Sequence, residues 1–169
     1  MPITATEIQY MHSGGAANAD PNASLGGVIS TTEITDATLH NLFDLVSGDE
    51  SSAGDVEYRC FYLKNNHGSL EWQNVSVWVE TDNSGVDTEI AIGLGTAAIG
   101  GTEQTVADES TAPAGVTFDT ALGEANELVI GNIPAGSHKA VWVRRTVSAA
   151  ASAASNLNVT IRANGDTAA

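Results

Sequence analysis

The feature that most constrains this sequence is a period of two that begins at Asp55 and continues almost to the end of the chain. Apolar side chains at every second position predict strands with one face toward a core. Turns rich in Gly, Asn, Asp and Pro separate the rows, and no helical pattern lies between them. The rows are Val56/Tyr58/Cys60/Tyr62, Val75/Val77/Val79, Thr88/Ile90/Ile92/Leu94, Val116/Phe118, Leu128/Ile130, Val141/Val143/Val147 and Leu157/Val159/Ile161. The pattern predicts an all-β protein, an antiparallel β-sandwich of seven to eight strands.

One segment before this region has a helical pattern. A short helix is predicted over residues 35–46, because apolar side chains recur at i, i+3, i+4 and i+7: Leu39, Leu42, Phe43 and Val46. Asp36 is placed to cap its start, and Gly48 lies just past its end. The following segment, residues 47–54, is predicted to be a loop.

The N-terminal part, residues 1–33, is predicted to be a strand followed by an extended arm, with the β-sandwich over residues 34–169 of one domain. The arm, residues 13–27, reads SGGAANADPNASLGG and has few side chains able to anchor a core. Because ordering a backbone residue costs about 1–2 kcal/mol, we expect this arm to be mobile in the free monomer and ordered against neighbouring subunits. The interface residues expected in it are Ser13, Gly14, Gly15, Asn18, Asp20, Pro21 and Leu25.

The charge balance excludes several classes of partner. The 169 residues include 6 Lys and Arg against 21 Asp and Glu, a formal net charge of −15. Such a surface repels phosphate backbones and anionic lipid, so neither nucleic acid nor membrane is an expected partner. The N-terminus lacks the pattern of a signal peptide, and no apolar run approaches the roughly 20 residues that span a bilayer. The single cysteine, Cys60, excludes an internal disulfide framework.

No constellation of residues indicates catalysis, a metal or a cofactor. The histidines are not spaced as ligands, and they are His12, His40, His67 and His138. The turn at residues 82–87 carries oxygen ligands for calcium but lacks the closing Glu, and it also reads as a plain hairpin turn. The glycine-rich stretch over residues 93–101 lacks the Lys-Ser/Thr of a phosphate loop. We therefore expect a protein that is not an enzyme and has no cofactor.

Two tryptophans interrupt the predicted valine rows. Trp78 lies between Val77 and Val79, and Trp142 lies between Val141 and Val143, so both indoles point away from the valines. One interpretation is that the protein's own arm and helix cover both outer sheet faces. The other is that Trp78 and Trp142, with Arg144, form an interface with another subunit, where Trp and Arg are enriched.

Three segments carry a resemblance to a known family. The arm SGGAANADPNASLGG leading into VIS, the segment EYRCFYLKNNHGSLEWQNVSVWV and the ending AVWVRRTV resemble small virion structural proteins of tailed bacteriophages, over Ile8 to about Gly165. The stretch LVIGNIPAGSHKAVWV is similar to immunoglobulin-like sandwich modules, in which an Ile-Pro-x-Gly turn precedes a late strand. The Cys–Trp–Cys framework of antibody domains is absent.

The resemblance implies a non-enzymatic structural protein of a phage particle that decorates or cements the capsid through subunit contacts. It implies a virion location after synthesis in the host cytoplasm, a homo-oligomer, and other virion proteins as partners, the major capsid protein among them. A neck, collar or tail component is one alternative. A carbohydrate- or host-surface-binding module, in which Trp78 and Trp142 stack on sugar, is the other.

Overall fold

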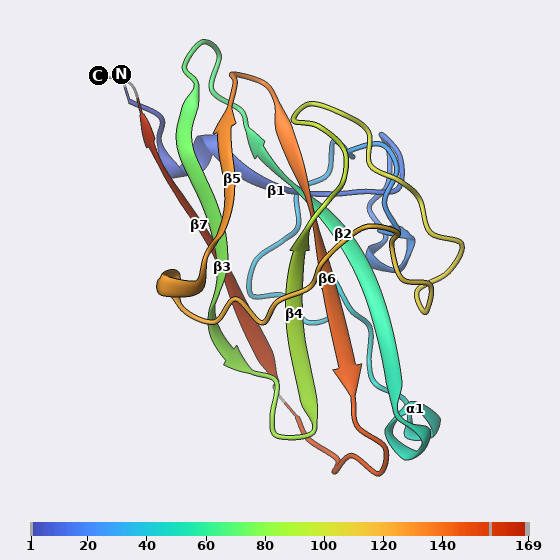
Figure 1. Ribbon diagram of the computed structural model, residues 1–169. Helices are drawn as coiled ribbons and strands as arrows, with labels where there is room; N and C mark the ends of the chain where they lie inside the picture. The colour runs from blue at the N-terminus through green and yellow to red at the C-terminus, as the bar shows by residue number, and fades with distance from the viewer. Residues whose placement is uncertain (1, 156, 168–169) are drawn as a thin grey trace.

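The computed structural model describes residues 2–155 and 157–167 (Figure 1). Most of the regular structure in these ranges is β: β1 (Ile8–His12), β2 (Asp55–Asn65), β3 (Trp72–Asn83), β4 (Thr88–Leu94), β5 (Leu128–Ile133), β6 (His138–Val147) and β7 (Asn158–Thr167). The helical elements are α1 (Gly48–Ala53) and the 3-10 turns η1 (Ala5–Glu7), η2 (Pro21–Ala23) and η3 (Glu124–Asn126). The predicted all-β class with one short helix is confirmed.

The strands form two antiparallel sheets, one in the order β1-β2-β6-β4 and one in the order β5-β3-β7 (Figure 1). In an immunoglobulin constant domain, strands A, B, E and D form one sheet, and C, F and G form the other. Here β1, β2, β6 and β4 take the places of A, B, E and D, and β3 and β7 take those of C and F. β5 lies between β4 and β6 in sequence and pairs with the other edge of β3. The sandwich is therefore immunoglobulin-like, with β5 as an additional strand beside β3 and no counterpart of strand G among the described residues.

The core between the sheets comes from the apolar rows that face inward. The larger sheet contributes Phe61 and Leu63 of β2, and the smaller sheet contributes a row of β3 that begins at Trp72. The predicted rows of β3, β4 and β6 are confirmed here by Val75, Val77, Val79, Ile90, Ile92, Val141 and Val143, each 6% exposed or less. Burying a side chain of this kind contributes about 1.5–3 kcal/mol, so this layer is a major source of the stability of the sandwich.

A second apolar layer covers the outer face of the larger sheet. Cys60 and Trp142 are cross-strand partners on this face, and both are fully buried. Their layer also contains Met11, Tyr62, Val106 and Ala140, with Leu25, Ile29, Val116 and Phe118 packed against it. Cys60 is therefore buried as expected, but its row faces away from the smaller sheet. The expected inward phase was wrong because both rows of β2 contain apolar side chains.

The segment 13–27 lies against its own subunit, which differs from the expected arm. β1 pairs only with residues 61–65 of β2, so the preceding part of that edge is open. The Cys60 N–H donates to the Ser24 carbonyl at 2.7 Å, and the Ser13 hydroxyl donates to the Cys60 carbonyl at 2.7 Å. Gly26 bridges to Thr105 in the loop that follows β4, and Figure 1 shows the two segments on the same side of the sheet. Backbone and serine hydrogen bonds, together with the packing of Leu25, hold a segment that has few large side chains to bury.

The predicted helix over residues 35–46 was wrong. This segment is irregular, and Ala37 and His40 have φ of 53° and 57°, outside the helical region. Leu42 and Phe43 still pack against the core between the sheets. A short amphipathic helix of this kind depends on tertiary support, and the inward packing here is satisfied without helical backbone.

The α-helix lies instead where a loop was expected. Ser47 caps α1: the Glu50 N–H donates to the Ser47 hydroxyl oxygen at 3.2 Å, and the Ser47 N–H donates to the Glu50 carboxylate at 2.6 Å. This reciprocal capping box satisfies two backbone donors at the helix start. The helix ends at Ala53, and Gly54 caps it with a φ of 81° that suits glycine. The predicted Val116/Phe118 strand is also absent; the neighbouring Asp119 forms only an isolated bridge to Ile92.

Candidate functional site

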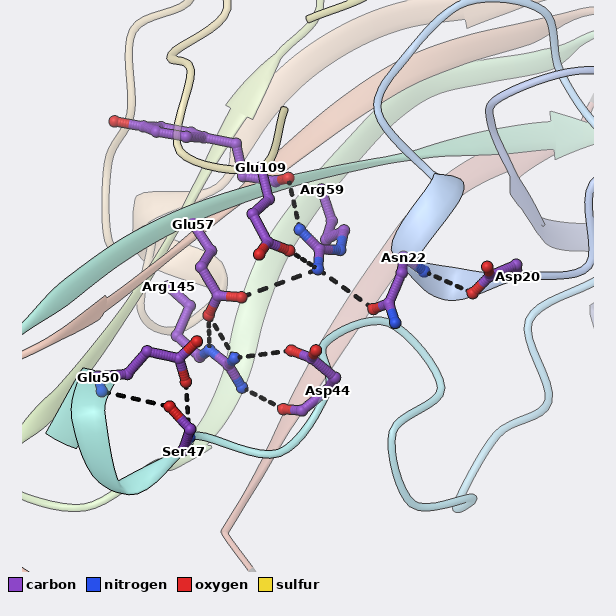
Figure 2. Close-up of polar contacts among 10 residues, drawn as sticks. Asp20, Asn22, Asp44, Ser47, Glu50, Glu57, Arg59, Glu109 and Arg145 are labelled. Atoms are coloured by element: carbon purple, nitrogen blue, oxygen red, sulfur yellow. Dashed lines mark hydrogen bonds and ion pairs between the residues drawn. The ribbon is translucent and has the colours of Figure 1, made fainter. Parts of the chain in front are cut away.

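Five charged side chains meet at the end of β2 that lies next to α1, and we call them the charge cluster: Asp44, Glu57, Arg59, Glu109 and Arg145 (Figure 2). Glu57 and Arg59 share the inward-facing row of β2 with Phe61, and Arg145 lies directly across from Glu57 on β6. Glu57 is 1% exposed, Arg59 0% and Arg145 8%. Charged groups this buried require partners.

Glu57 lies between the two guanidinium groups. The Arg145 Nε donates to Glu57 Oε2 at 2.5 Å, and a second Arg145 nitrogen, Nη2, contacts the same oxygen. Arg59 Nη2 lies 3.8 Å from the other carboxylate oxygen, Glu57 Oε1. Charge-assisted hydrogen bonds of this kind are stronger than those between neutral groups. They offset part of the desolvation of the buried carboxylate.

The same guanidinium groups hold three loops on the sandwich. Arg59 Nη2 donates to Glu109 Oε2 at 2.5 Å and to Asn22 Oδ1 at 3.2 Å. Arg145 Nη1 donates to the Asp44 carbonyl at 2.8 Å, and its Nη2 lies 3.4 Å from Asp44 Oδ1. The loop after β4, the N-terminal segment and the loop before α1 therefore converge on two arginines (Figure 2).

An aromatic ring strengthens this junction. The Phe43 ring centroid lies 5.5 Å from the Arg59 Cζ and 4.8 Å from the Arg145 Cζ. Contacts of a guanidinium with a ring face contribute about 0.5–1 kcal/mol at exposed sites and more when desolvated. Phe43 thus fixes the loop before α1 beside both arginines.

The charges of the cluster do not cancel, since three carboxylates face two guanidinium groups. Burial raises the pKa of Glu57, and this effect outweighs the lowering caused by Arg145 and Arg59. Two buried atoms of the cluster, Glu57 Oε1 and Arg59 Nε, have no hydrogen-bond partner among the described residues.

The carboxylate oxygens of Asp44, Glu57 and Glu109 lie within 4.8 Å of one another, close enough to share a cation. The donor set does not fit a metal centre, however, because the two arginines already bind the oxygens that a cation would need. What this arrangement can do is hold loops in place.

The structure buries both tryptophans of the expected interface. Trp142 is 0% exposed beneath the N-terminal segment, and Trp78 is 3% exposed on the outer face of the smaller sheet. The Trp78 Nε1 donates to Glu80 at 2.5 Å. Arg144 is partly exposed and pairs with Glu89 at 2.7 Å. The N-terminal segment therefore covers Trp142, as the first of the two interpretations expected, whereas the predicted helix that was to cover the other face does not form.

The expected arm residues bind one another and the sheet. Asn18 Nδ2 donates to the Ser13 carbonyl at 2.6 Å, and the Asp20 side chain accepts from the Asn22 N–H at 2.9 Å at the start of η2. Pro21 is the first residue of η2, next to the Asn22 that bonds Arg59. Gly14 and Gly15 adopt positive φ, and Leu25 packs into the outer apolar layer. These residues form part of the fold of this subunit.

The histidines and the turn at residues 82–87 have local partners. His12 Nδ1 lies 3.0 Å from the Ser24 hydroxyl, and His138 packs edge-on against Tyr62 with the ring centroids 4.8 Å apart. Asp82 accepts from the Ser84 N–H and Asp87 from the Ser152 N–H, each at 2.9 Å. Within residues 2–155 and 157–167, only the carboxylates of the charge cluster gather closely enough to share a cation.

The glycine-rich stretch after β4 is held by a buried carboxylate. Glu103 is 3% exposed; it accepts from the Ala97 N–H at 2.9 Å and from the Thr96 hydroxyl at 3.1 Å. Burial raises the pKa of Glu103, but hydrogen bonds from Ala97, Thr96 and Gln104 lower it, and the lowering prevails. Lys139 Nζ donates to the Gly95 carbonyl at 2.8 Å. The stretch is therefore an anchored loop.

Sequence reasoning missed every member of the charge cluster. A usable signal was present, since Glu57 and Arg59 occupy the same row as Phe61 and Leu63, and Arg145 occupies the row of Val143. Charges at inward positions of a strand indicate a buried ion pair. The partners Asp44 and Glu109 come from loops, and no spacing in the sequence indicates them.

Searches with models of protein families, with curated proteins and with solved structures found no match to this chain. None of the helices in the described ranges is long and apolar enough to cross a membrane.

Proposed function

We propose that this chain is a non-enzymatic structural protein of a tailed-phage particle that decorates or cements the capsid through subunit contacts. The observation that carries the proposal is the charge cluster, which uses its buried charges to fix loops. Glu57 lies against Arg145, and Arg59 binds both Glu109 and Asn22. The chain thereby presents loops of fixed shape beside a rigid sandwich.

Fixed loops suit a protein that docks on a surface. Loop ordering costs free energy on association, and loops that are ordered beforehand reduce that cost. The resemblance of three segments to small phage virion proteins supports the same role. The net charge of −15 keeps free copies apart before assembly.

The carbohydrate-binding alternative loses its main support. It required Trp78 and Trp142 to present ring faces to a sugar, and these residues are 3% and 0% exposed. The neck, collar or tail alternative uses the same fold and the same kind of subunit contact. Location in the particle separates it from capsid decoration.

The test uses particles of a phage or prophage that carries this gene. Purified particles from the wild type and from a deletion strain are compared by mass spectrometry and cryo-EM. We expect the chain in wild-type particles in a fixed ratio to the major capsid protein, with head density that the deletion removes. Density at the neck or tail instead of the head would rule out capsid decoration and support the neck, collar or tail alternative. Particles that lack the chain would refute the structural role.

A further inference from the structure

The loop before α1 exposes two leucines to solvent. Leu39 is 74% exposed and Leu45 is 73% exposed, while Leu42 and Phe43 between them pack inward against the core. We call residues 35–46 the leucine loop. Single exposed apolar residues are ordinary on a protein surface. Leu39 and Leu45 lie on the same loop, at most about 20 Å apart by chain length.

The leucine loop is held in one shape. Arg145 binds the Asp44 carbonyl at 2.8 Å, and the Phe43 ring lies beside two guanidinium groups. At the other end, Asn41 Nδ2 donates to the Thr35 carbonyl at 3.0 Å. The loop is also strained, because Ala37 and His40 have positive φ and flank Leu39. Backbone strain of this kind is concentrated at functional sites and persists only where surrounding contacts maintain it.

The surroundings of the exposed leucines are acidic. Asp36 lies on the loop itself and Asp49 follows in the first turn of α1. Asp44 on the loop is paired with Arg145, and the Glu50 carboxylate accepts from the Ser47 N–H. A partner that buries the leucines must bring positive charge around its apolar contact, since like charges at an interface cost free energy.

A second copy of this chain has little positive charge to offer. Five of its six Lys and Arg are already bound within the chain: Arg59 and Arg145 in the charge cluster, Arg144 to Glu89, Arg162 to Glu80, and Lys139 to the carbonyls of Gly95 and Ala97. The cations that would rim a contact with the leucine loop therefore belong to another protein.

We propose that the leucine loop is a docking surface for a different protein, one with an apolar patch rimmed by Lys or Arg. This inference rests on the proposed function, in which that protein is a component of the particle. The proposed contact is apolar with a charged rim. It takes the place of the contacts that were expected through residues 13–27 and through the tryptophans.

The test uses a probe of defined chemistry. A synthetic amphipathic helical peptide with Leu on one face and Lys on the others is titrated into the purified full chain by calorimetry. A second peptide replaces every Leu by Ser and keeps the Lys. The variant Leu39→Ser/Leu45→Ser removes the apolar contact. The matched control, Val86→Ser/Val129→Ser, changes residues that are 102% and 69% exposed elsewhere on the surface. Light scattering reports self-association of each protein.

We expect the Leu/Lys peptide to bind the wild type and the control, and to bind the loop variant roughly tenfold more weakly or worse. Binding should weaken in salt, and the Ser/Lys peptide should not distinguish the proteins. Equal binding by wild type and loop variant would overturn the proposal, as would an equal loss in the control. Self-association that the loop variant abolishes would overturn it in favour of a second copy. Because no particle is present, this outcome is independent of the particle test of the proposed function.

Discussion

Replacing Arg145 by Met removes the nearest partner of a buried carboxylate. Glu57, 1% exposed, would keep only Arg59, whose Nη2 lies 3.8 Å from Glu57 Oε1. Breaking a buried pair by removing one member costs about 3–5 kcal/mol. The substitution also removes the hydrogen bond to the Asp44 carbonyl and the contact with Phe43. We expect Arg145→Met to lower the free energy of unfolding by about 3–5 kcal/mol.

The measurement is urea unfolding followed by tryptophan fluorescence, with calorimetry for the melting temperature. For a chain of about this length, 1 kcal/mol corresponds to about 2–4 °C in Tm, so the expected fall is about 6–20 °C. The adjacent Arg144→Met is the matched control. Its pair with Glu89 is more exposed than the cluster, with side-chain exposures of 29% and 53%, and should contribute less than about 1 kcal/mol.

A double variant separates pairing from packing. Glu57→Gln with Arg145→Met removes both charges, so the buried carboxylate no longer lacks its partner. We expect it to be more stable than Arg145→Met alone. The reasoning is refuted if Arg145→Met costs no more than Arg144→Met, or if the double variant is the least stable of the series.

Three further predictions follow from other contacts. Gly26→Ala should displace the N-terminal segment, because a Cβ there would lie 1.9 Å from the Gln104 carbonyl oxygen. Cys60 in the native protein should then react with a thiol reagent. The control Gly15→Ala, at positive φ but in open space, should leave Cys60 protected. Glu103→Gln should destabilise the protein at pH 7, and the Tm difference from wild type should shrink as the pH falls below 4.5. The reason is that a carboxyl whose folded pKa is lowered from 4.5 loses its contribution to stability on protonation. A Tm difference that stays constant from pH 7 to pH 3 would contradict this. Millimolar calcium or zinc should leave Tm unchanged, because arginines hold the carboxylates of the charge cluster. Metal binding at a hundredfold excess over Kd would raise Tm by several degrees, and such a rise would contradict this prediction.

The strands were predictable where one row is apolar and the other polar or aromatic. Val75, Val77 and Val79 form such a row, and they lie in the core between the sheets as expected. In β2 both rows carry apolar side chains, so periodicity predicts a strand but does not say which face is inward. The N-terminal segment determines that the outer row is buried as well, since Leu25 and its neighbours pack over Cys60.

The two errors before β2 have different causes. The spacing of Leu39, Leu42 and Phe43 fits a helix, but only the last two pack inward, and tertiary contacts override a weak local preference. The helix that does form has a readable signal, because Ser47 and Glu50 have the S-x-x-E spacing of a capping box. Glu109 and Arg59 are 50 residues apart, and only the folded loop brings them together.

The position of residues 13–27 limits how this protein can assemble. An arm that reached onto a neighbour would have to release the bonds between Ser24 and Cys60 and between Ser13 and Cys60, and it would uncover Trp142. Each buried polar group left unpaired would cost about 1–3 kcal/mol, and the exposed indole would lose its apolar burial. A neighbour offering only a groove for Gly, Ala and Asn side chains does not compensate for these losses. Assembly through loops that are already fixed avoids them, which favours the leucine loop over the N-terminal segment as the surface that meets a partner.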